Sequence, residues 1–412
     1  MRFRGVQWAV LTVFLSLFTA PSWAQSADPS PSPQPPEQPP PAQPTPPEPP
    51  LPTPAPSPEP PAAPPPTEVP PGAAGAGGPS GPLPVYGPAS SKVFNPDMAV
   101  IGDFLGAIGK NDSGRGTPSL ELHEAEASFQ AIVDPYARAD FFLTFSPDEV
   151  GVEEGFITFT SLPANLLVKV GKMRGSFGKV NQMHNHVMPW TDRPLVTQNL
   201  VGGEEGISDA GISVSRLFPN EILFLEATAE VYRGVSPELF RAPKRGDLTY
   251  VGRVRGYRDL TESTNLDFGG SFAQGHNEAG PSLKTRLWGA DLAFRWRPLR
   301  RAIYRRLIVR TELVWSRKEL EAGSVKAFGA YVSGEYQFAR RWFAGARLDR
   351  SDRAAEASLQ DKGVSALLTY WPSEFSQIRG QYRYTRYAEG IKANELLFQV
   401  QFSIGAHGAH TF

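Results

Sequence analysis

The stretch 119–145, SLELHEAEASFQAIVDPYARADFFLTF, alternates polar and apolar side chains with a period of two on each side of a central Asp-Pro turn. Glu124 and Glu126 share a face in the first half, and Arg138 and Asp140 share one in the second. This alternation predicts two β-strands whose faces meet different surroundings. Each half has about ten residues, enough to cross a bilayer at a tilt. A transmembrane hairpin and a hairpin of a soluble β-sandwich both fit this stretch.

The N-terminus has the parts of a secretory signal. Arg2 and Arg4 precede an apolar run over residues 6–17, and Ser22 and Ala24 supply the small residues that a signal peptidase reads. We expect residues 1–24 to be a cleaved signal peptide, with a retained anchor as the alternative. No later apolar run approaches the roughly 20 residues of a membrane helix, so a membrane location would require strands. The chain has no Cys, which excludes disulfides and thiol chemistry.

Residues 25–92 are dominated by Pro and, toward the end, by Gly. Such a segment cannot bury a core, so we expect a disordered linker, largely in the polyproline II conformation. At about 3.1 Å per residue, its Pro-rich part would reach on the order of 140 Å. It is either a semi-rigid periplasmic tether that lies on the cell wall or a tail with no specific partner.

The folded part begins near residue 93, and alternation within it predicts sixteen strands. The expected ranges are 98–108, 119–133, 136–145, 151–160, 166–173, 209–217, 222–232, 248–259, 265–275, 285–297, 306–317, 326–338, 342–350, 363–371, 375–386 and 395–404. Several apolar faces end in aromatic residues, among them Trp288, Trp296, Tyr370 and Trp371. Girdles of this kind are typical of strands that end at a membrane interface. We therefore predict an all-β fold over residues 93–412, a transmembrane up-and-down antiparallel β-barrel of about 16 strands.

The connections between the expected strands alternate between short and long. Short ones include 134–135, 219–220 and 372–374; long ones include 174–208 and 318–325. Two connections break the pattern: 298–305 is long for the short side, and 146–150 is short for the long side. Outer-membrane barrels have short periplasmic turns and longer outer loops. An even number of strands then places both ends of the barrel on the turn side, which agrees with a periplasmic N-terminal arm.

Three motifs resemble a known family. They are FNPDMAVIGDFLG at 94–106, VKVGKMRGSFGKVN at 168–181 and PWTDRP at 189–194, and they resemble phosphate-selective porin O/P-like proteins over roughly 94–412. The resemblance implies a sixteen-stranded outer-membrane porin that forms a homotrimer, with its long third loop in the lumen. It also implies a C-terminal aromatic residue, here Phe412, that the barrel-assembly machinery reads. Because alternation stops near Ile404, this signal would instead lie at 396–402.

The long connection 174–208 is the expected constriction of the pore, with an external cap as the alternative. It begins with RGSFGKVN and ends in the Gly-rich GGEEGIS, so that it can bend while its charges line a narrowed passage. The candidates for the constriction are Arg174, Lys179, Asp192, Arg193, Glu204 and Glu205.

The polar strand faces carry charges of both signs. The basic residues that we expect to line the lumen are Arg138, Lys169, Arg253, Arg255, Arg295, Arg310, Arg347, Arg379 and Arg383. Acids such as Asp103, Glu126 and Asp140 dominate the early strands, which would give a field across the lumen. A phosphate channel needs many Lys and Arg along the path, and the sequence does not show this cleanly. Salt bridges that brace the barrel wall explain these charges equally well.

The sequence indicates no metal, cofactor or catalytic site. His184 and His186 in the long connection, and His407 and His410 in the tail, have no carboxylate at a recognisable ligand interval, so we expect solvated histidines. No nucleophile elbow, phosphate loop or zinc-protease motif occurs. The net charge of −1 gives no electrostatic case for nucleic acid.

These features predict a porin in a Gram-negative outer membrane rather than an enzyme. It would be a passive diffusion channel for small hydrophilic solutes or ions, with a preference for anions or phosphate as the finer hypothesis. The alternative is a structural barrel that anchors the envelope to the cell wall through its Pro-rich arm. The expected partners are outer-membrane lipid, two further copies of the chain, the barrel-assembly machinery and the cell wall, and no nucleic acid.

Overall fold

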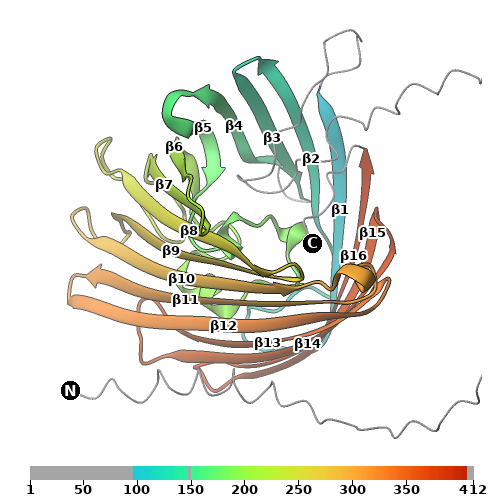
Figure 1. Ribbon diagram of the computed structural model, residues 1–412. Helices are drawn as coiled ribbons and strands as arrows, with labels where there is room; N and C mark the ends of the chain where they lie inside the picture. The colour runs from blue at the N-terminus through green and yellow to red at the C-terminus, as the bar shows by residue number, and fades with distance from the viewer. Residues whose placement is uncertain (1–95, 147–149, 406–412) are drawn as a thin grey trace, which may run out of the picture. The chain divides into compact units, whose positions relative to one another are not determined.

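The computed structural model describes residues 96–146 and 150–405. The predicted signal peptide (1–24), the Pro/Gly-rich linker (25–92) and the tail with His407, His410 and Phe412 lie outside the described residues. Sixteen strands follow one another along the chain (Figure 1). They are β1 (Asp97–Lys110), β2 (Leu120–Asp134), β3 (Ala137–Phe145), β4 (Val150–Leu162), β5 (Leu166–Arg174), β6 (Ser208–Phe218), β7 (Phe224–Tyr232), β8 (Thr249–Thr261), β9 (Thr264–His276), β10 (Lys284–Trp296), β11 (Arg306–Leu320), β12 (Gly323–Ala339), β13 (Trp342–Asp352), β14 (Gln360–Ser373), β15 (Ser376–Arg386) and β16 (Lys392–Gly405).

The sheet closes on itself because the first strand pairs with the last. β1 and β16 run antiparallel from Ala99↔Gly405 to Lys110↔Asn394. Every other strand pairs with its neighbours in sequence, so all sixteen have both edges hydrogen-bonded. A closed ladder satisfies the backbone groups without water, as a sheet in lipid must. The prediction of an all-β, up-and-down antiparallel barrel is confirmed.

The connections alternate in length as expected, with one correction. β2 and β3 are joined by 135–136 and β12 and β13 by 340–341, whereas β5 and β6 are joined by 175–207. The expected long loop at 318–325 is wrong, because β11 and β12 extend until only 321–322 separate them. The start of β1 and the end of β16 lie at the rim that carries the 135–136 turn.

The outer face of the barrel is apolar and the inner face is polar. On β14, Val364 and Leu368 are about half exposed, while Ser365 and Thr369, which directly follow them, are buried. This is the reverse of a soluble barrel, where apolar side chains fill the interior. Apolar side chains on the outer surface fit a lipid environment.

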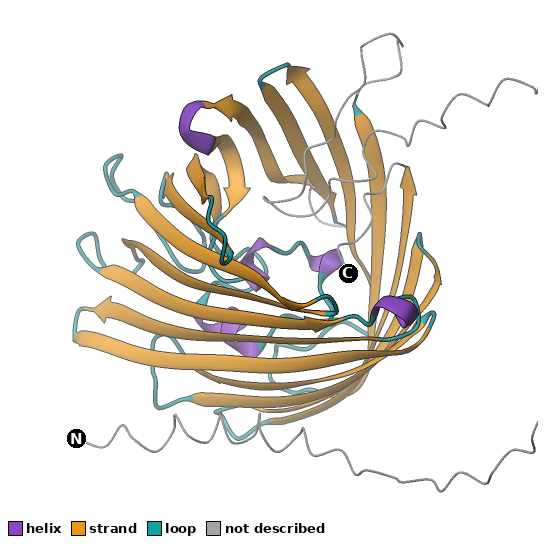
Figure 2. Cartoon of the chain, in the orientation of Figure 1, coloured by secondary structure: helices purple, strands orange, loops and turns teal. Residues whose placement is uncertain are grey.

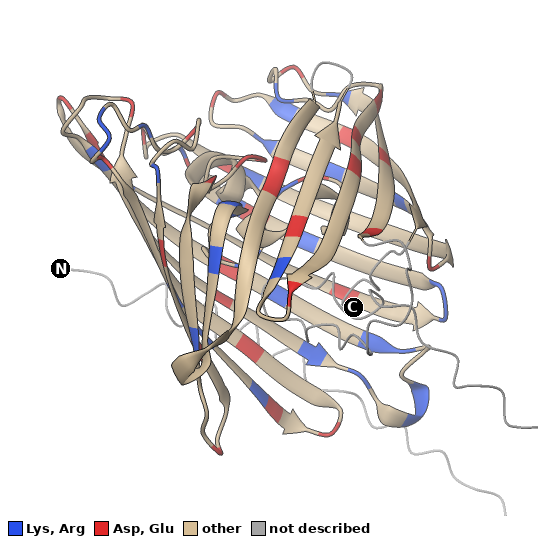
Figure 3. Ribbon diagram, turned by 90° about the horizontal axis from the view of Figure 1, so that it is seen from above, with Lys and Arg blue, Asp and Glu red and all other residues tan. Residues whose placement is uncertain are grey.

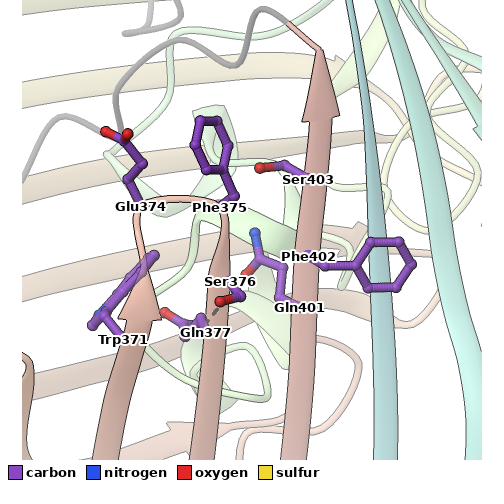
Figure 4. A pocket seen from close by; sticks show the side chains of 8 residues that line it. All are labelled: Trp371, Glu374, Phe375, Ser376, Gln377, Gln401, Phe402 and Ser403. Atoms are coloured by element: carbon purple, nitrogen blue, oxygen red, sulfur yellow. Dashed lines mark hydrogen bonds between the residues drawn. The ribbon is translucent and has the colours of Figure 1, made fainter.

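Outward-facing rings also cover gaps that glycine leaves on a neighbouring strand. Figure 4 shows Phe402 pointing across β1, away from Gln401 and Ser403 on the same strand. Gly102 is the registered partner of Phe402, and a Cβ at position 102 would collide with the ring. Glycine under an aromatic ring fixes the register at the seam where the barrel closes.

Aromatic side chains form two clusters near opposite ends of the strands. Trp342 and Tyr370 stack with ring centroids 4.5 Å apart beside the short turn 340–341. Near the other rim, four aromatic residues form one cross-strand row through the pairs Phe272↔Trp288, Trp288↔Trp315 and Trp315↔Phe328. Their positions match interface girdles.

Four 3-10 turns and one short α-helix accompany the strands in the described part of the chain. They are η1 (Pro163–Asn165), η2 (Val180–Gln182), η3 (Asn185–Val187) and α2 (Leu195–Leu200), and η4 (Leu299–Arg301) follows β10. Among the described residues, no helix has the length and apolar character needed to cross a membrane.

Gly171 gives a test of backbone geometry in β5. Its φ of +147° lies in a region that side chains disfavour, and a Cβ there would collide with the Gly155 carbonyl oxygen on β4. We expect Gly171→Ala to lower the unfolding free energy by roughly 2 kcal/mol, measured by denaturant titration in detergent. Gly380→Ala is the control, since a Cβ at position 380 meets nothing within 4 Å. Equal stability of the two variants would contradict this account.

Candidate functional site

The segment 175–207 lies inside the barrel and spans from one wall to the opposite one. Its backbone N–H groups donate to Ser271 on β9 (3.0 Å from Gly178), to Glu312 on β11 (2.9 Å from Val180) and to Gln381 on β15 (3.1 Å from Thr191), among others. Figure 2 shows its short helical turns within the ring of strands. The segment therefore folds inward, as expected, and does not form an external cap. We call it the inner loop.

Apolar packing fills part of the space between the inner loop and the wall. Phe177, Val180, Trp190 and Val196 of the loop belong to one buried cluster with wall residues from β4, β5, β7 to β12 and β14. The Trp190 ring meets the Tyr331 ring edge-on at 5.1 Å. This cluster gives the loop a defined position, because exposing its apolar surface to a wet lumen would cost a free energy of about 25 cal/mol per Å².

Wall carboxylates accept hydrogen bonds from the loop backbone. Glu230 on β7 accepts from the Ser176 N–H and hydroxyl at 2.7 and 2.8 Å. Glu312 accepts from the N–H groups of Lys179 and Val180, and Asp349 accepts from the N–H of Leu195. Charge-assisted bonds of this kind are stronger than neutral ones, and they satisfy backbone donors that the loop would otherwise leave buried and unpaired.

Asp192 connects the loop to two arginines of the far wall. Its carboxylate lies 3.0 Å from the Arg347 guanidinium and 2.8 Å from that of Arg383, and it accepts from Gln381 Nε2 at 2.5 Å. Burial alone would raise the pKa of Asp192, but the two guanidinium groups outweigh burial and lower the pKa to about 2. Asp192 is therefore charged over the whole neutral range.

Lys179 makes the corresponding contact with strands β9 and β10. Its Nζ lies 3.0 Å from Asp267 and 3.7 Å from Asp291. Three lumen-lining candidates pair with the same acids: Arg255 and Arg295 with Asp267, and Arg253 with Asp291. These charges form one network of alternating sign.

The other four constriction candidates make contacts within the loop or near its ends. Arg174 pairs with Glu153 and donates to the carbonyl oxygens of Glu204 and Glu205, whose side chains are exposed. Arg193 is 2 % exposed and donates to the carbonyl oxygens of Val180 (3.1 Å) and Met183 (2.9 Å). Arg174 and Arg193 therefore hold the fold of the loop.

The remaining lumen-lining candidates divide into paired and unpaired groups. Arg138 pairs with Asp140 at 2.6 Å, while Arg379 bonds to neutral acceptors, among them the Met188 carbonyl oxygen at 3.0 Å. Within the described part of the chain, Lys169 and Arg310 make no hydrogen bond or ion pair; Lys169 lies over the Phe156 ring. Figure 3 shows both signs of charge along the strands. Wall-bracing pairs thus account for most of these arginines.

A cluster of acids and histidines joins the loop to β2 and β4. We call Glu124, Glu126, Glu153, Glu154, His184 and His186 the Glu–His cluster. His184 bridges Glu126 (2.6 Å) and Glu154 (2.7 Å) through its two ring nitrogens. The expectation of solvated histidines is wrong for this pair, since His184 is 8 % and His186 is 7 % exposed.

Burial and charge act in opposite directions on the two histidines. Burial disfavours the charged ring of His184, but Glu153, Glu126 and Glu154 outweigh it and raise the pKa of His184 well above its usual value. Burial is the largest influence on His186 and lowers the pKa of His186. His184 is therefore an imidazolium at neutral pH, and His186 is neutral.

Sequence reasoning missed this cluster because its members come from three separate elements. The register between β3 and β4 also shifts between Phe142 and Leu143, which pair with Glu154 and Val152. The bulge leaves Glu153 without a registered partner and lets adjacent acids both contact the loop. The one available signal was the Glu-Glu pair in an otherwise alternating strand.

Comparisons with known proteins agree with this architecture. No family model matches the chain. A protein of Aquifex aeolicus described as uncharacterised is 29% identical over 390 residues, which cover 79% of this chain and 81% of that protein. The anion-selective porin from Comamonas acidovorans matches with a TM-score of 0.54 at 10% identity, over 74% of this chain and 98% of its own. The chain has the fold of outer-membrane porins.

Two further solved structures share this fold. The outer membrane channel DcaP of Acinetobacter baumannii matches with a TM-score of 0.51 at 12% identity, over 75% of this chain and 96% of its own. The trimer form of OmpT, an outer membrane protein of Vibrio cholerae, matches with a TM-score of 0.50 at 10% identity, over 75% and 98%. At these identities the likeness is one of fold.

Asp192→Asn tests the anchor between the loop and the far wall. The substitution keeps the shape but removes the charge that two buried arginines share, so we expect a loss of about 3 kcal/mol in unfolding free energy, at the low end for broken buried pairs. The loss should be constant between about pH 5 and pH 8, since the stabilisation from a lowered pKa fades only as pH falls from about 3.9 through the folded value. Tryptophan fluorescence during urea unfolding measures it.

Asp112→Asn provides the matched control. Asp112 pairs with Lys110 at 3.0 Å, but both side chains are more than half exposed. An exposed pair contributes roughly 0–1 kcal/mol, so this variant should unfold like the unaltered chain. Equal losses for both substitutions would remove the basis for the anchor.

Proposed function

We propose that the protein is a passive diffusion channel of an outer membrane for small hydrophilic solutes and ions. The observation that carries this proposal is the inner loop, which is bonded to opposite walls inside a closed barrel of sixteen strands. A barrel of sixteen strands is wide enough for an aqueous lumen, and a loop fixed across that lumen would narrow the passage. The fold shared with an anion-selective porin and an outer membrane channel supports this proposal.

The location and partners follow from the same proposal. The apolar outer surface would contact outer-membrane lipid, and the rim of short turns would face the periplasm together with the Pro-rich arm. The barrel-assembly machinery would insert the exported chain, and three copies would associate, as in the trimer form of the similarly folded OmpT. The resemblance to phosphate-selective porin O/P-like proteins gives the same arrangement.

Lys179 and Asp192 are the residues that we assign to the edge of the constriction. Both reach from the inner loop to strands of the wall, and their partners set the local charge of the passage. Glu204 and Glu205 have exposed side chains near the end of the loop and would meet solutes there. Arg174 and Arg193 would act by holding the loop in shape.

We assign a weak preference for anions to this channel, carried by Lys169 and Arg310. Arg310 lies on the inner face of β11. Its registered partner on β12 is Ser333, and the acid of that strand, Glu335, lies two residues further along, opposite Ile308. Most other lumen arginines are neutralised by acids, which argues for a modest preference instead of strict phosphate selectivity.

Planar-bilayer recordings with the purified chain test the channel function. Stepwise conductance increases should appear on insertion and should persist after deletion of residues 28–82. A correctly folded sample that inserts but gives no steps would contradict the proposal. Loss of envelope integrity after the same deletion, without conductance in the intact chain, would favour the structural anchor.

Arg310→Gln tests the assignment of ion preference. Removing one unpaired charge about 8 Å from a passing ion raises the energy of an anion and lowers that of a cation by roughly 0.5 kcal/mol each in water, so the anion-to-cation permeability ratio should fall about six-fold. Reversal potentials under a salt gradient measure that ratio. Arg216→Gln is the control, because Arg216 lies on the exposed outer side of β6, over the Phe218 ring. An unchanged ratio for Arg310→Gln would contradict the assignment.

A further inference from the structure

The Glu–His cluster has the composition and spacing of a metal-binding site. Ligand atoms of Glu126, His184 and His186 all lie within 4.8 Å of one another, and all three residues are buried. Glu126 belongs to a second group of this kind, with Glu124 and Glu153. These residues reach one point from β2, β4 and the inner loop.

The distances suit tetrahedral coordination. His184 Nδ1 lies 2.6 Å from Glu126 Oε2 and 3.6 Å from Glu153 Oε2, and His186 Nδ1 lies 3.5 Å from the same Glu126 oxygen. Ligand atoms about 2.0–2.2 Å from a tetrahedral Zn²⁺ are roughly 3.4 Å apart. Of these three contacts, only the one between His184 and Glu126 must lengthen, by roughly 0.8 Å, as expected when a shared proton gives way to a cation.

The far side of His184 is already oriented as in known metal-bound imidazoles. Its Nε2 lies 2.7 Å from Glu154 Oε2, while the other Glu154 oxygen accepts the Arg174 N–H at 2.7 Å. A carboxylate that accepts from one ring nitrogen leaves the other nitrogen as the lone-pair donor. The Phe142 ring packs edge-on against His184 with centroids 4.9 Å apart and restricts access of water from that side.

Three side-chain atoms in the cluster, among them Glu124 Oε1, lack the hydrogen-bond partners that burial requires. His186 Nδ1 and Glu153 Oε2 are both buried without a hydrogen-bond partner, although the His186 side chain is 6 % exposed and faces Glu126. Buried polar atoms are normally satisfied, and an orphaned imidazole nitrogen beside carboxylates is a site for a cation.

The charge of the cluster also favours a cation. It holds four carboxylates, and among the described residues their one ion pair with Arg or Lys is that of Glu153 with Arg174. His184 can neutralise a second carboxylate as an imidazolium, which still leaves excess negative charge in a buried place.

We propose that the Glu–His cluster binds one divalent transition-metal cation of the Zn²⁺ class. Glu126, His184 through Nδ1 and His186 through Nδ1 are the ligands, and Glu153 supplies the fourth. The cation displaces the proton that His184 shares with Glu126, so at least one proton leaves for each cation bound. Imidazole nitrogens with carboxylates select such a cation over Mg²⁺ or Ca²⁺, which prefer oxygen ligands alone. This site is independent of solute passage and fastens the inner loop to β2 and β4.

Isothermal titration calorimetry tests the proposal. The folded chain in detergent is first treated with a chelator and is then titrated with Zn²⁺ and, separately, with Mg²⁺. The full-length chain is compared with a background in which His407→Gln and His410→Gln remove the tail histidines. His186→Gln is introduced into that background, because the His186 ring has no hydrogen bond to lose at Nδ1. His276→Gln is the matched control, since His276 lies 3.8 Å from a single acid, Asp247, elsewhere in the chain. Co²⁺ absorption reports the coordination geometry.

The expected result is one Zn²⁺ per chain in the background protein, little response to Mg²⁺ and a tetrahedral Co²⁺ spectrum. His186→Gln should weaken Zn²⁺ binding at least ten-fold, whereas His276→Gln should leave it unchanged. The proposal is overturned if the background protein binds no stoichiometric Zn²⁺ or if the His186 variant binds as the background does. If His186→Gln does not fold, Zn²⁺ stoichiometry and the Co²⁺ spectrum of the background protein decide alone.

Discussion

Closure of the backbone hydrogen-bond ladder is the constraint on which the rest of the structure depends. Pairing of β1 with β16 removes the last free edge, which lets an apolar surface face outward without exposed backbone groups. The same closure turns every second side chain inward. A barrel of sixteen strands is too wide for those side chains to fill, so the chain places its own longest connection in the lumen.

The inner loop is stable in that position because the wall supplies hydrogen-bond acceptors. Glu230, Glu312 and Asp349 accept hydrogen bonds from its backbone. In the other direction, the carboxylate of Asp192 in the loop forms ion pairs with the arginines of the far wall. These carboxylates therefore serve the loop as much as the passage. Since most charges are neutralised locally, the few that are not, such as Arg310, would have a disproportionate influence on ions in the proposed channel.

The sequence reveals the strands because alternation is a local property, whereas the partners of the loop depend on closure of the whole barrel. All sixteen strands were expected near their observed places, and the inward fold of 175–207 was expected from its length and glycines. The error at 318–325 arose because β11 and β12 continue beyond their apolar stretch as a polar hairpin. His184 seemed solvated because Glu126 and Glu154 lie 58 and 30 residues away in sequence.

The central claim is that the inner loop lies against the wall of the barrel in the assembled protein, and cross-linking tests it directly. The chain has no Cys, so a pair introduced as Val196→Cys and Gly329→Cys supplies its only two thiols. A Cβ at position 329 would lie 3.0 Å from the Val196 Cβ, close to the roughly 3.8 Å of a disulfide. Mild oxidation of the folded protein should produce an intramolecular disulfide, as it should for the neighbouring-strand pair Val332→Cys and Leu348→Cys. A disulfide in the strand pair but none between loop and wall would contradict the account.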